Sequence, residues 1–415
     1  MVDTTPFLPG LSPVQGKAVV ARFDGGRLSS EGGLLVLREV ESRLGLADRL
    51  AACLKDPRAP EKVVHRLAQI IRFRMLMIAA GYQDGNDAAT LRRDPMFKLA
   101  LGRLPSDEEL CSQSTISRLE NLPDRRALLR LGRALIEQYC ASFRRVPKRI
   151  VLDIEDTFDR VHGGQQLRLF NAFHDDYGFQ PIVVFDGEGR FVTALLRPGK
   201  RPGGHEIRAF LRRLVGAIRA HWPKVEILLR ADSHYAGPEV FDWCRENRVD
   251  WVLGLAPNVA LRRHVEALEK ATAKRFKAVP DRGKLRRFTQ FYDAAQSWRR
   301  VERIIARVEV GPEGSDARFI APTSRVVAPS TSMSGSIAHA GRPRTISKHG
   351  KITSPRTAPP ATRPRPTSSA SSFMPALIGC CGRCAARCPT GRPGASCSLI
   401  PCGCASSNSP PASSS

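Results

Sequence analysis

The chain has 415 residues, and its 65 Lys and Arg residues outnumber 40 Asp and Glu, which gives a formal net charge of +25. It contains no apolar run of the roughly 18 to 20 residues that a membrane span needs, and its first residues lack the features of a secretion signal, so we expect a cytoplasmic protein with no membrane segment. The excess of positive charge favours a polyanionic partner, most simply nucleic acid, but it does not separate an enzyme from a passive binder.

Residues 1–145 are predicted to form an all-α, DNA-binding region after a loose leader over residues 1–25. Apolar residues recur every three or four positions from Val63 to Ile78, which is typical of the buried face of a helix. Ser112 and Asp124 are residue types that begin helices, and each precedes a further helical segment. These residues alone fit a purely structural helical domain as well as one that reads DNA.

Residues 146–257 change to an α/β pattern. The predicted order is a strand (149–157), a two-stranded hairpin (180–185 and 191–196), a helix (207–218), a strand (225–230), a helix (237–247) and a strand (249–255). Three antiparallel strands followed by helical crossovers give a mixed sheet that is flanked by helices. This is the element order of the ribonuclease H-like fold.

The remaining chain divides into two segments of different composition. Residues 258–320 are expected to form a small, basic, β-rich insertion that consists of a basic helix and alternating segments at Arg286–Tyr292 and Arg299–Val310. Residues 321–415 are expected to be disordered, because no acidic residue follows Thr323 and Phe373 is the last aromatic residue. Seven of the 11 cysteines lie in this tail, but their spacing lacks the second pair of a zinc site, and a basic DNA-binding arm is a further alternative.

Acidic residues at the ends of two predicted strands are the candidates for chemistry. Asp153, Glu155 and Asp156 end the first strand, and Asp232 follows the fourth, which should be its neighbour in the sheet. Strand alternation places Asp153 and Glu155 on one face and Asp156 on the other, unless the strand ends before it. Clustered carboxylates suit Mg²⁺, which also binds phosphate oxygens. Taken singly, Asp232 also fits a turn residue, and the first group also fits a solvated strand end.

Seven short motifs resemble those of DDE-type insertion-sequence transposases (transposase DDE domain group 1) over roughly residues 15–320. They are Leu152-Asp153-Ile154-Glu155-Asp156-Thr157, His162-Gly163-Gly164-Gln165-Gln166, Leu169-Phe170-Asn171, Leu196-Arg197-Pro198, Arg230-Ala231-Asp232-Ser233-His234-Tyr235, Trp243-Cys244 and Gly254-Leu255-Ala256.

The resemblance implies a cut-and-paste recombinase that binds terminal inverted repeats and target DNA, both double-stranded, at the nucleoid, and it is compatible with a homodimer. In that family two Asp and one Glu hold two Mg²⁺ ions for phosphodiester cleavage and strand transfer. Asp232 matches the second acid. The first is left open among Asp153, Glu155 and Asp156, because the family often has its Asp where this chain has Glu155.

The third family acid has no counterpart, since no Glu follows Glu313. The codons of the tail can also be read in a shifted frame, in which the third base of each codon joins the first two bases of the next. In this one frame, three stretches can encode helical segments that resemble those of the family: Ser330–Gly341, Pro343–Thr357 and Phe373–Cys384. We therefore hypothesise a frameshift near Ile320, of genuine, programmed or sequencing origin, and predict that the chain as written has little or no cleavage activity. The alternatives are a non-catalytic DNA-binding remnant that represses transposition and a ribonuclease H-like nuclease.

Overall fold

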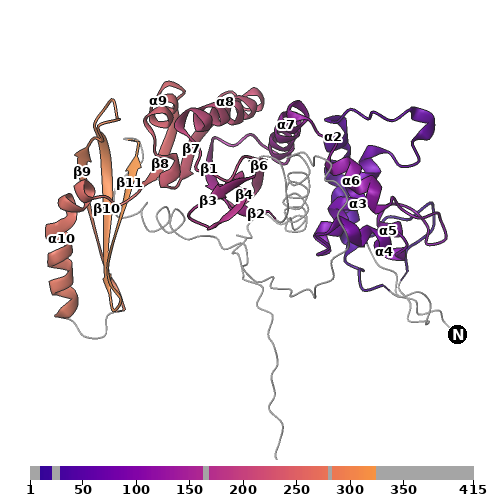
Figure 1. Cartoon of the computed structure of the whole chain (residues 1–415), viewed down its shortest axis with the longest axis horizontal. Coiled ribbons are helices and arrows are strands. Elements are labelled where there is room, and N and C mark those ends of the chain that lie inside the picture. Colours follow the sequence, from indigo (N-terminus) through magenta and orange to yellow (C-terminus); the bar gives the residue numbers. More distant parts are fainter. Residues whose placement is uncertain (1–9, 21–28, 162–167, 279–282, 324–415) are drawn as a thin grey trace, which may run out of the picture.

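The computed structural model describes residues 10–20, 29–161, 168–278 and 283–323. The N-terminal helices lie at one end of the molecule, a mixed sheet runs through its middle, and the last described helix and strands lie at the other end (Figure 1). The tail expected over residues 321–415 falls almost wholly outside the described residues, as do the motif at residues 162–166 and most of the leader.

The N-terminal region is helical, as predicted. Its helices are α1 (Leu34–Leu44), α2 (Leu46–Ala52), η1 (Pro60–Lys62), α3 (Leu67–Ala79), η2 (Gly85–Asp87), α4 (Ala88–Leu91), α5 (Pro95–Ala100), α6 (Gln113–Glu120) and α7 (Arg125–Ala141). Ser112 precedes α6, and the side chain of Asp124 caps α7 by accepting the amide hydrogen of Ala127 at 2.6 Å. The helix expected from Val63 begins only at Leu67, because Val63 has an extended backbone (φ −86°, ψ 93°) after η1.

One arginine of this region is buried in its core. Arg74 on α3 is 2% exposed, and its guanidinium donates to Glu120 at 2.8 Å and to the carbonyl oxygens of Tyr82 and Gln83. A buried charge is tolerated only when it is paired and hydrogen-bonded, as it is here. Arg74 therefore holds α3, α6 and the following loop together and cannot contact DNA.

Eight strands form the mixed sheet, in the order β6-β5-β1-β7-β8-β11-β10-β9. Their bounds are β1 (Arg149–Asp156), β5 (Ile182–Asp186), β6 (Phe191–Leu195), β7 (Glu226–Ala231), β8 (Val249–Leu255), β9 (Leu285–Asp293), β10 (Glu302–Gly311) and β11 (Gly314–Pro322). β5 and β6 are antiparallel to their neighbours, whereas β1, β7 and β8 run parallel. The predicted ribonuclease H-like arrangement is confirmed, including the adjacency of β1 and β7.

Helices α8 (Gly204–His221) and α9 (Pro238–Glu246) cover one face of this sheet. Alternate residues of β1, namely Ile150, Leu152 and Ile154, join the core that these helices complete. The C-terminal part of α7 packs on the same core, while Leu131 and Leu135 of α7 belong to the core of the N-terminal helices. The long helix α7 thus joins the helical region to the sheet.

Two parts of the structure differ in detail from the sequence expectation. A three-stranded sheet of β2 (Asp159–Arg160), β4 (Asp176–Phe179) and β3 (Leu169–Asn171) lies between β1 and β5 in the chain and was not predicted. In the segment expected as a β-rich insertion, the predicted basic helix is α10 (Val259–Lys277) and the two alternating segments are β9 and β10, but the third strand, β11, was not predicted. β11 pairs antiparallel with β8, so these strands extend the main sheet.

Candidate active site

The candidate site lies where the parallel neighbours β1 and β7 end. Ile154 of β1 is in register with Ala231 of β7, so Asp156 and Asp232 follow at the same edge of the sheet although they are 76 positions apart in the sequence. Carboxyl ends of neighbouring parallel strands are where α/β folds generally place their ligand sites. The predicted meeting of these two strand ends is found in the structure.

A histidine completes a cluster of three potential metal ligands at this edge. The Nδ1 atom of His234, on η3 (Ser233–Tyr235), lies 3.3 and 3.4 Å from the two carboxylate oxygens of Asp156 and 3.8 Å from Oδ2 of Asp232. One ligand atom from each of the three residues lies within 4.8 Å of the others. His234 was not singled out in the sequence, although its place two residues after a strand-ending Asp is a usable signal.

The two carboxylates lie in different environments. The side chain of Asp156 is 3% exposed, whereas that of Asp232 is 43% exposed. Burial opposes ionisation of Asp156, but the hydrogen bond and charge of His234, together with Gln180, lower its pKa below the ordinary value. Burial raises the pKa of Asp232, and His234 offsets this only in part. The hydrogen bond to Asp156 raises the pKa of His234. The pKa values of the two carboxylates are therefore shifted in opposite directions.

Neighbouring side chains hold this cluster in place. The Gln180 side-chain amide donates to Asp156, and the buried guanidinium of Arg197 donates to the carbonyl oxygens of Gln180 and Lys200 and to Glu206. Arg197 belongs to a motif noted in the sequence, and its bonds link the loop before α8 to the site. The side chain of Arg201 reaches the carbonyl oxygen of Ser233 at 3.1 Å, which places a cation beside Asp232.

The other two sequence candidates do not join the cluster. The Asp153 carboxylate pairs with the Arg230 guanidinium through bonds of 2.5 and 2.6 Å. Asp153 and Glu155 alternate with Asp156 along β1, so they lie on the opposite face of the strand, as the period of two predicted. Of the three acids left open at the end of β1, only Asp156 lies beside Asp232.

A glycine of β8 allows the turn that carries Asp232 to approach the sheet. A Cβ atom on Gly254 would lie 3.2 Å from the Ser233 nitrogen and 3.3 Å from the Asp232 carbonyl carbon. Both are backbone atoms, so the turn would have to move to make room. Gly254 is thus a positioning residue for Asp232, and it belongs to a motif quoted above.

The family assignment follows from comparison with known proteins. The family model for the transposase DDE domain group 1 matches residues 11–349. The chain belongs to this family. Members are DNA-transposing enzymes, and DDE transposases generally use divalent metal ions. The match ends within the tail segment 321–415, beyond the last described residue, Thr323.

Other comparisons add little to this assignment. A search of curated proteins found no match. A cryo-EM structure of a piggyBac transposase synaptic complex with hairpin DNA is similar to the chain with a TM-score of 0.35 and 12% identity, over 73% of this chain and 63% of that one. The chain thus spans less than two thirds of the length of that protein, and a likeness at this level assigns no function. Among the described helices, none is both long and apolar enough to cross a bilayer.

The donor set of the cluster fits a divalent cation. Mg²⁺ in phosphoryl-transfer sites is held by one or two carboxylates together with water and substrate oxygens, which matches Asp156 and Asp232. The buried hydroxyl of Tyr235 lies beside Asp156, and burial, followed by the charges of Asp156 and Asp232, raises the pKa of that hydroxyl. Tyr235 therefore forms part of the polar wall of the cluster.

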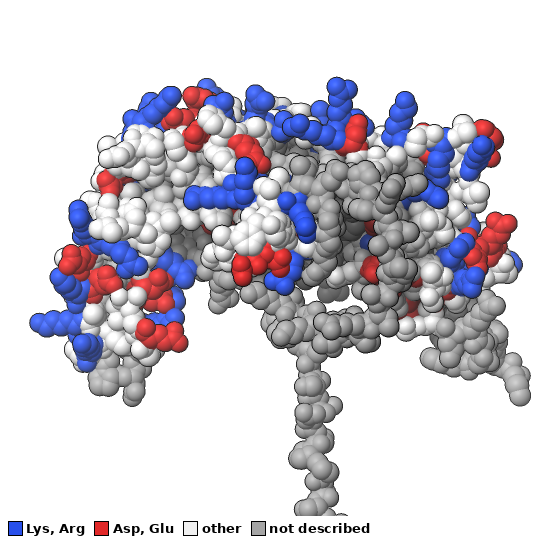
Figure 2. All heavy atoms as spheres, viewed as in Figure 1, with Lys and Arg blue, Asp and Glu red and all other residues white. Residues whose placement is uncertain are grey.

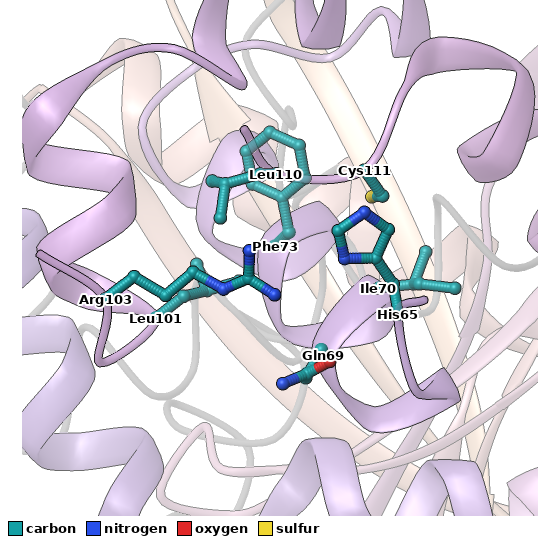
Figure 3. A pocket seen from close by; sticks show the side chains of 8 residues that line it. All are labelled: His65, Gln69, Ile70, Phe73, Leu101, Arg103, Leu110 and Cys111. Carbon is teal, nitrogen blue, oxygen red and sulfur yellow. The ribbon is translucent and has the colours of Figure 1, made fainter. Parts of the chain in front are cut away.

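Two hollows elsewhere in the molecule do not contact the cluster. The pocket in Figure 3 lies among the N-terminal helices, where His65, Phe73 and Arg103 line a space of only about 10 Å³. A groove of about 570 Å³ lies at the other end of β1, β7 and β8. Four cationic side chains (Arg149, Arg219, Lys224 and Arg248) and two acidic ones (Glu226 and Asp250) are among those that line it.

Proposed function

We propose that this chain descends from a cut-and-paste DNA transposase whose Asp156 and Asp232 bind Mg²⁺ for cleavage of DNA phosphodiesters at terminal inverted repeats and for strand transfer into target DNA. The carrying observation is that β1 and β7 bring these two carboxylates to one edge of a ribonuclease H-like sheet. Asp153 is assigned a structural role, because its carboxylate is occupied by Arg230.

Each residue of the site has a definite task in this proposal. Asp156, which His234 and Gln180 keep ionised, is the firm ligand, while the more exposed Asp232 faces the entering substrate. Arg201 beside Asp232 can contact the negatively charged phosphodiester and hold it over the acids. When bound, the ion supplies Lewis-acid stabilisation of the charge that develops on the phosphate.

The basic groove is the proposed contact for a further stretch of DNA backbone. It lies seven residues along β1 from Asp156, which is about 23 Å at roughly 3.3 Å per residue. One wall is fixed by the Arg219 guanidinium, which donates to the carbonyl oxygens of Asn247 and Arg248. Figure 2 shows further Lys and Arg side chains, interspersed with acidic ones, along the margin where α7, α8 and α9 lie. This distribution suits a nucleoid-bound protein with extended duplex DNA.

We further propose that the chain as written binds DNA without cleaving it. Two features of the sequence support the proposed loss of the third family acid: no Glu follows Glu313, and the composition of the tail fits an out-of-frame segment. With only two carboxylates, the second of the two metal ions lacks a protein ligand. The reaction then loses the stabilisation of the transition state that this second ion would supply. The second candidate function, a non-catalytic repressor that occupies the repeats, follows from the same observation.

The test combines gel shift with cleavage of a terminal-repeat duplex in Mg²⁺. The chain should shift the duplex without cutting it. A version whose segment after residue 320 is returned to the alternative frame should cut, and Asp156→Asn or Asp232→Asn should abolish that cutting while leaving the shift. Cleavage by the unaltered chain would contradict the proposed inactivity. Failure of the Asn variants to abolish cutting would contradict the site assignment.

A further inference from the structure

We propose that His234 is itself a ligand of the ion held by Asp156 and Asp232, and that its imidazole shifts the ion preference of the site from Mg²⁺ towards Mn²⁺. This inference rests on the proposed function only in using the same two carboxylates. It adds a nitrogen ligand to a site whose sequence-predicted ligands were all carboxylates.

The geometry of the ring supports direct coordination. The same nitrogen, Nδ1, faces both carboxylates, at 3.3 Å from Asp156 and 3.8 Å from Asp232. As it stands, this nitrogen hydrogen-bonds to Asp156. A bound ion would replace that hydrogen bond, with the Nδ1 proton released to water. Distances of this size between ligand atoms are those spanned by a single ion with bonds of about 2.0 to 2.2 Å.

The backbone fixes the ring in this position. The Asp232 carboxylate accepts the amide hydrogen of His234 at 2.8 Å, which closes a tight turn at the start of η3. The next residue, Tyr235, is fully buried, so the turn is anchored in the core.

The chemistry of the donor set carries the ion preference. Mg²⁺ strongly prefers oxygen ligands and keeps much of its water, whereas imidazole suits transition-metal ions. Two carboxylates and one imidazole therefore bind Mn²⁺ more tightly than two carboxylates alone, while Mg²⁺ gains little from the nitrogen. Removal of His234 should weaken Mn²⁺ binding at least about tenfold, which is the lower end of the loss seen when supporting residues of metal sites are changed.

The experiment measures Mn²⁺ binding to the full chain by the electron paramagnetic resonance signal of free Mn²⁺, and Mg²⁺ binding by competition. His234→Ala should weaken Mn²⁺ binding about tenfold or more and Mg²⁺ binding less than about threefold. His234→Asn offers an oxygen near the position of Nδ1, so it should preserve Mg²⁺ binding without restoring that of Mn²⁺. The matched control is His264→Ala on α10, whose ring contacts Asp293 and Phe291 instead.

The outcomes separate this inference from the proposed function. If Asp156→Asn and Asp232→Asn abolish ion binding while His234→Ala leaves the ratio of Mn²⁺ to Mg²⁺ affinity unchanged, His234 is not a ligand and the two-carboxylate site stands. If the Asn variants bind both ions normally, the site assignment itself is wrong. Thermal unfolding of each variant checks that a loss of binding does not reflect a loss of fold.

Discussion

Whether Asp153 or Asp156 is the metal ligand depends on which face of β1 each side chain occupies. Asp156 lies on the same face of β1 as Ile150, Leu152 and Ile154. The turn after β7 brings Asp232 and His234 to this end of the strand. Asp153 lies on the other side, where Arg230 of the neighbouring strand occupies both of its oxygens. A carboxylate satisfied in this way stabilises the sheet and is not free to bind an ion.

We predict that Asp153→Asn destabilises the protein without weakening ion binding. The variant leaves the Arg230 guanidinium in a largely buried place without its counter-charge, and removal of one partner of such a pair costs roughly 3 kcal/mol or more. Urea denaturation measures the loss of unfolding free energy, and an Mn²⁺ titration of the folded variant measures binding. Ion binding that falls as far as in Asp156→Asn would place Asp153 in the metal site.

At the residue scale, the sequence predicted the two strand ends but not the ligand set. The alternation along β1 separated Asp156 from the other two acids, but it could not tell which face the turn after β7 would approach. That depends on the tertiary contacts of Gly254 and on the hydrogen bonds that orient His234. Arg74 is a second example of what the sequence cannot predict. A basic residue on a helix is expected to be exposed to solvent, and only the structure reveals its buried partner Glu120.

At the scale of elements, the site is built by three parallel strands and one turn. β1 supplies Asp156, and the turn after β7 supplies Asp232 and His234. β8 supplies Gly254, whose missing side chain lets that turn pack closely. The position of Asp232 thus depends on a residue that carries no functional group.

We predict that Gly254→Ala weakens ion binding by about tenfold, since its Cβ pushes the backbone of Asp232 and Ser233 away from Asp156. The control is Gly216→Ala within α8, where a Cβ meets no atom within 4 Å. That change should leave ion binding unaltered and raise stability by up to about 1 kcal/mol, because Ala is the better helix former. Equal ion affinities in the two variants would remove the positioning role assigned to Gly254.

Most elements of the core were predictable because each carries a clear period and clear end signals. The hairpin of β5 and β6, the helices α8 and α9, and the strands β7 and β8 all appear where the pattern indicated. The small sheet of β2, β3 and β4 was missed, because its strands have only two to four residues each. The pairing of β11 with β8 was also missed, since the sequence pattern defines strands but not their distant partners.

At the scale of the whole molecule, the proposed DNA contacts lie at opposite ends of the central strands. The acids lie at one edge of the sheet, and the groove of Arg149, Lys224 and Arg248 lies at the opposite edge. The two sites are separated by about 23 Å along β1, at roughly 3.3 Å per residue. In the function proposed above, the acids and the groove contact different parts of the DNA substrate.

We predict that Arg149→Ala combined with Lys224→Ala lowers the salt dependence of DNA binding. Each lost phosphate contact reduces the slope of log K against log salt concentration by about 0.9, so the double variant should lose roughly 2 in slope. Binding titrations between 50 and 200 mM salt (about the usual range) measure this slope. Lys270→Ala with Lys274→Ala on α10 is the matched control, and an equal loss of slope there would show that the groove has no special part in binding.

The most direct test of the central claim is an anomalous difference map from crystals of the chain grown with Mn²⁺. We expect a peak within bonding distance of Asp156 and Asp232, with the Nδ1 atom of His234 in the same coordination shell. A peak beside Asp153 or Glu155, or no peak at this edge of the sheet at a saturating concentration of Mn²⁺, would contradict it.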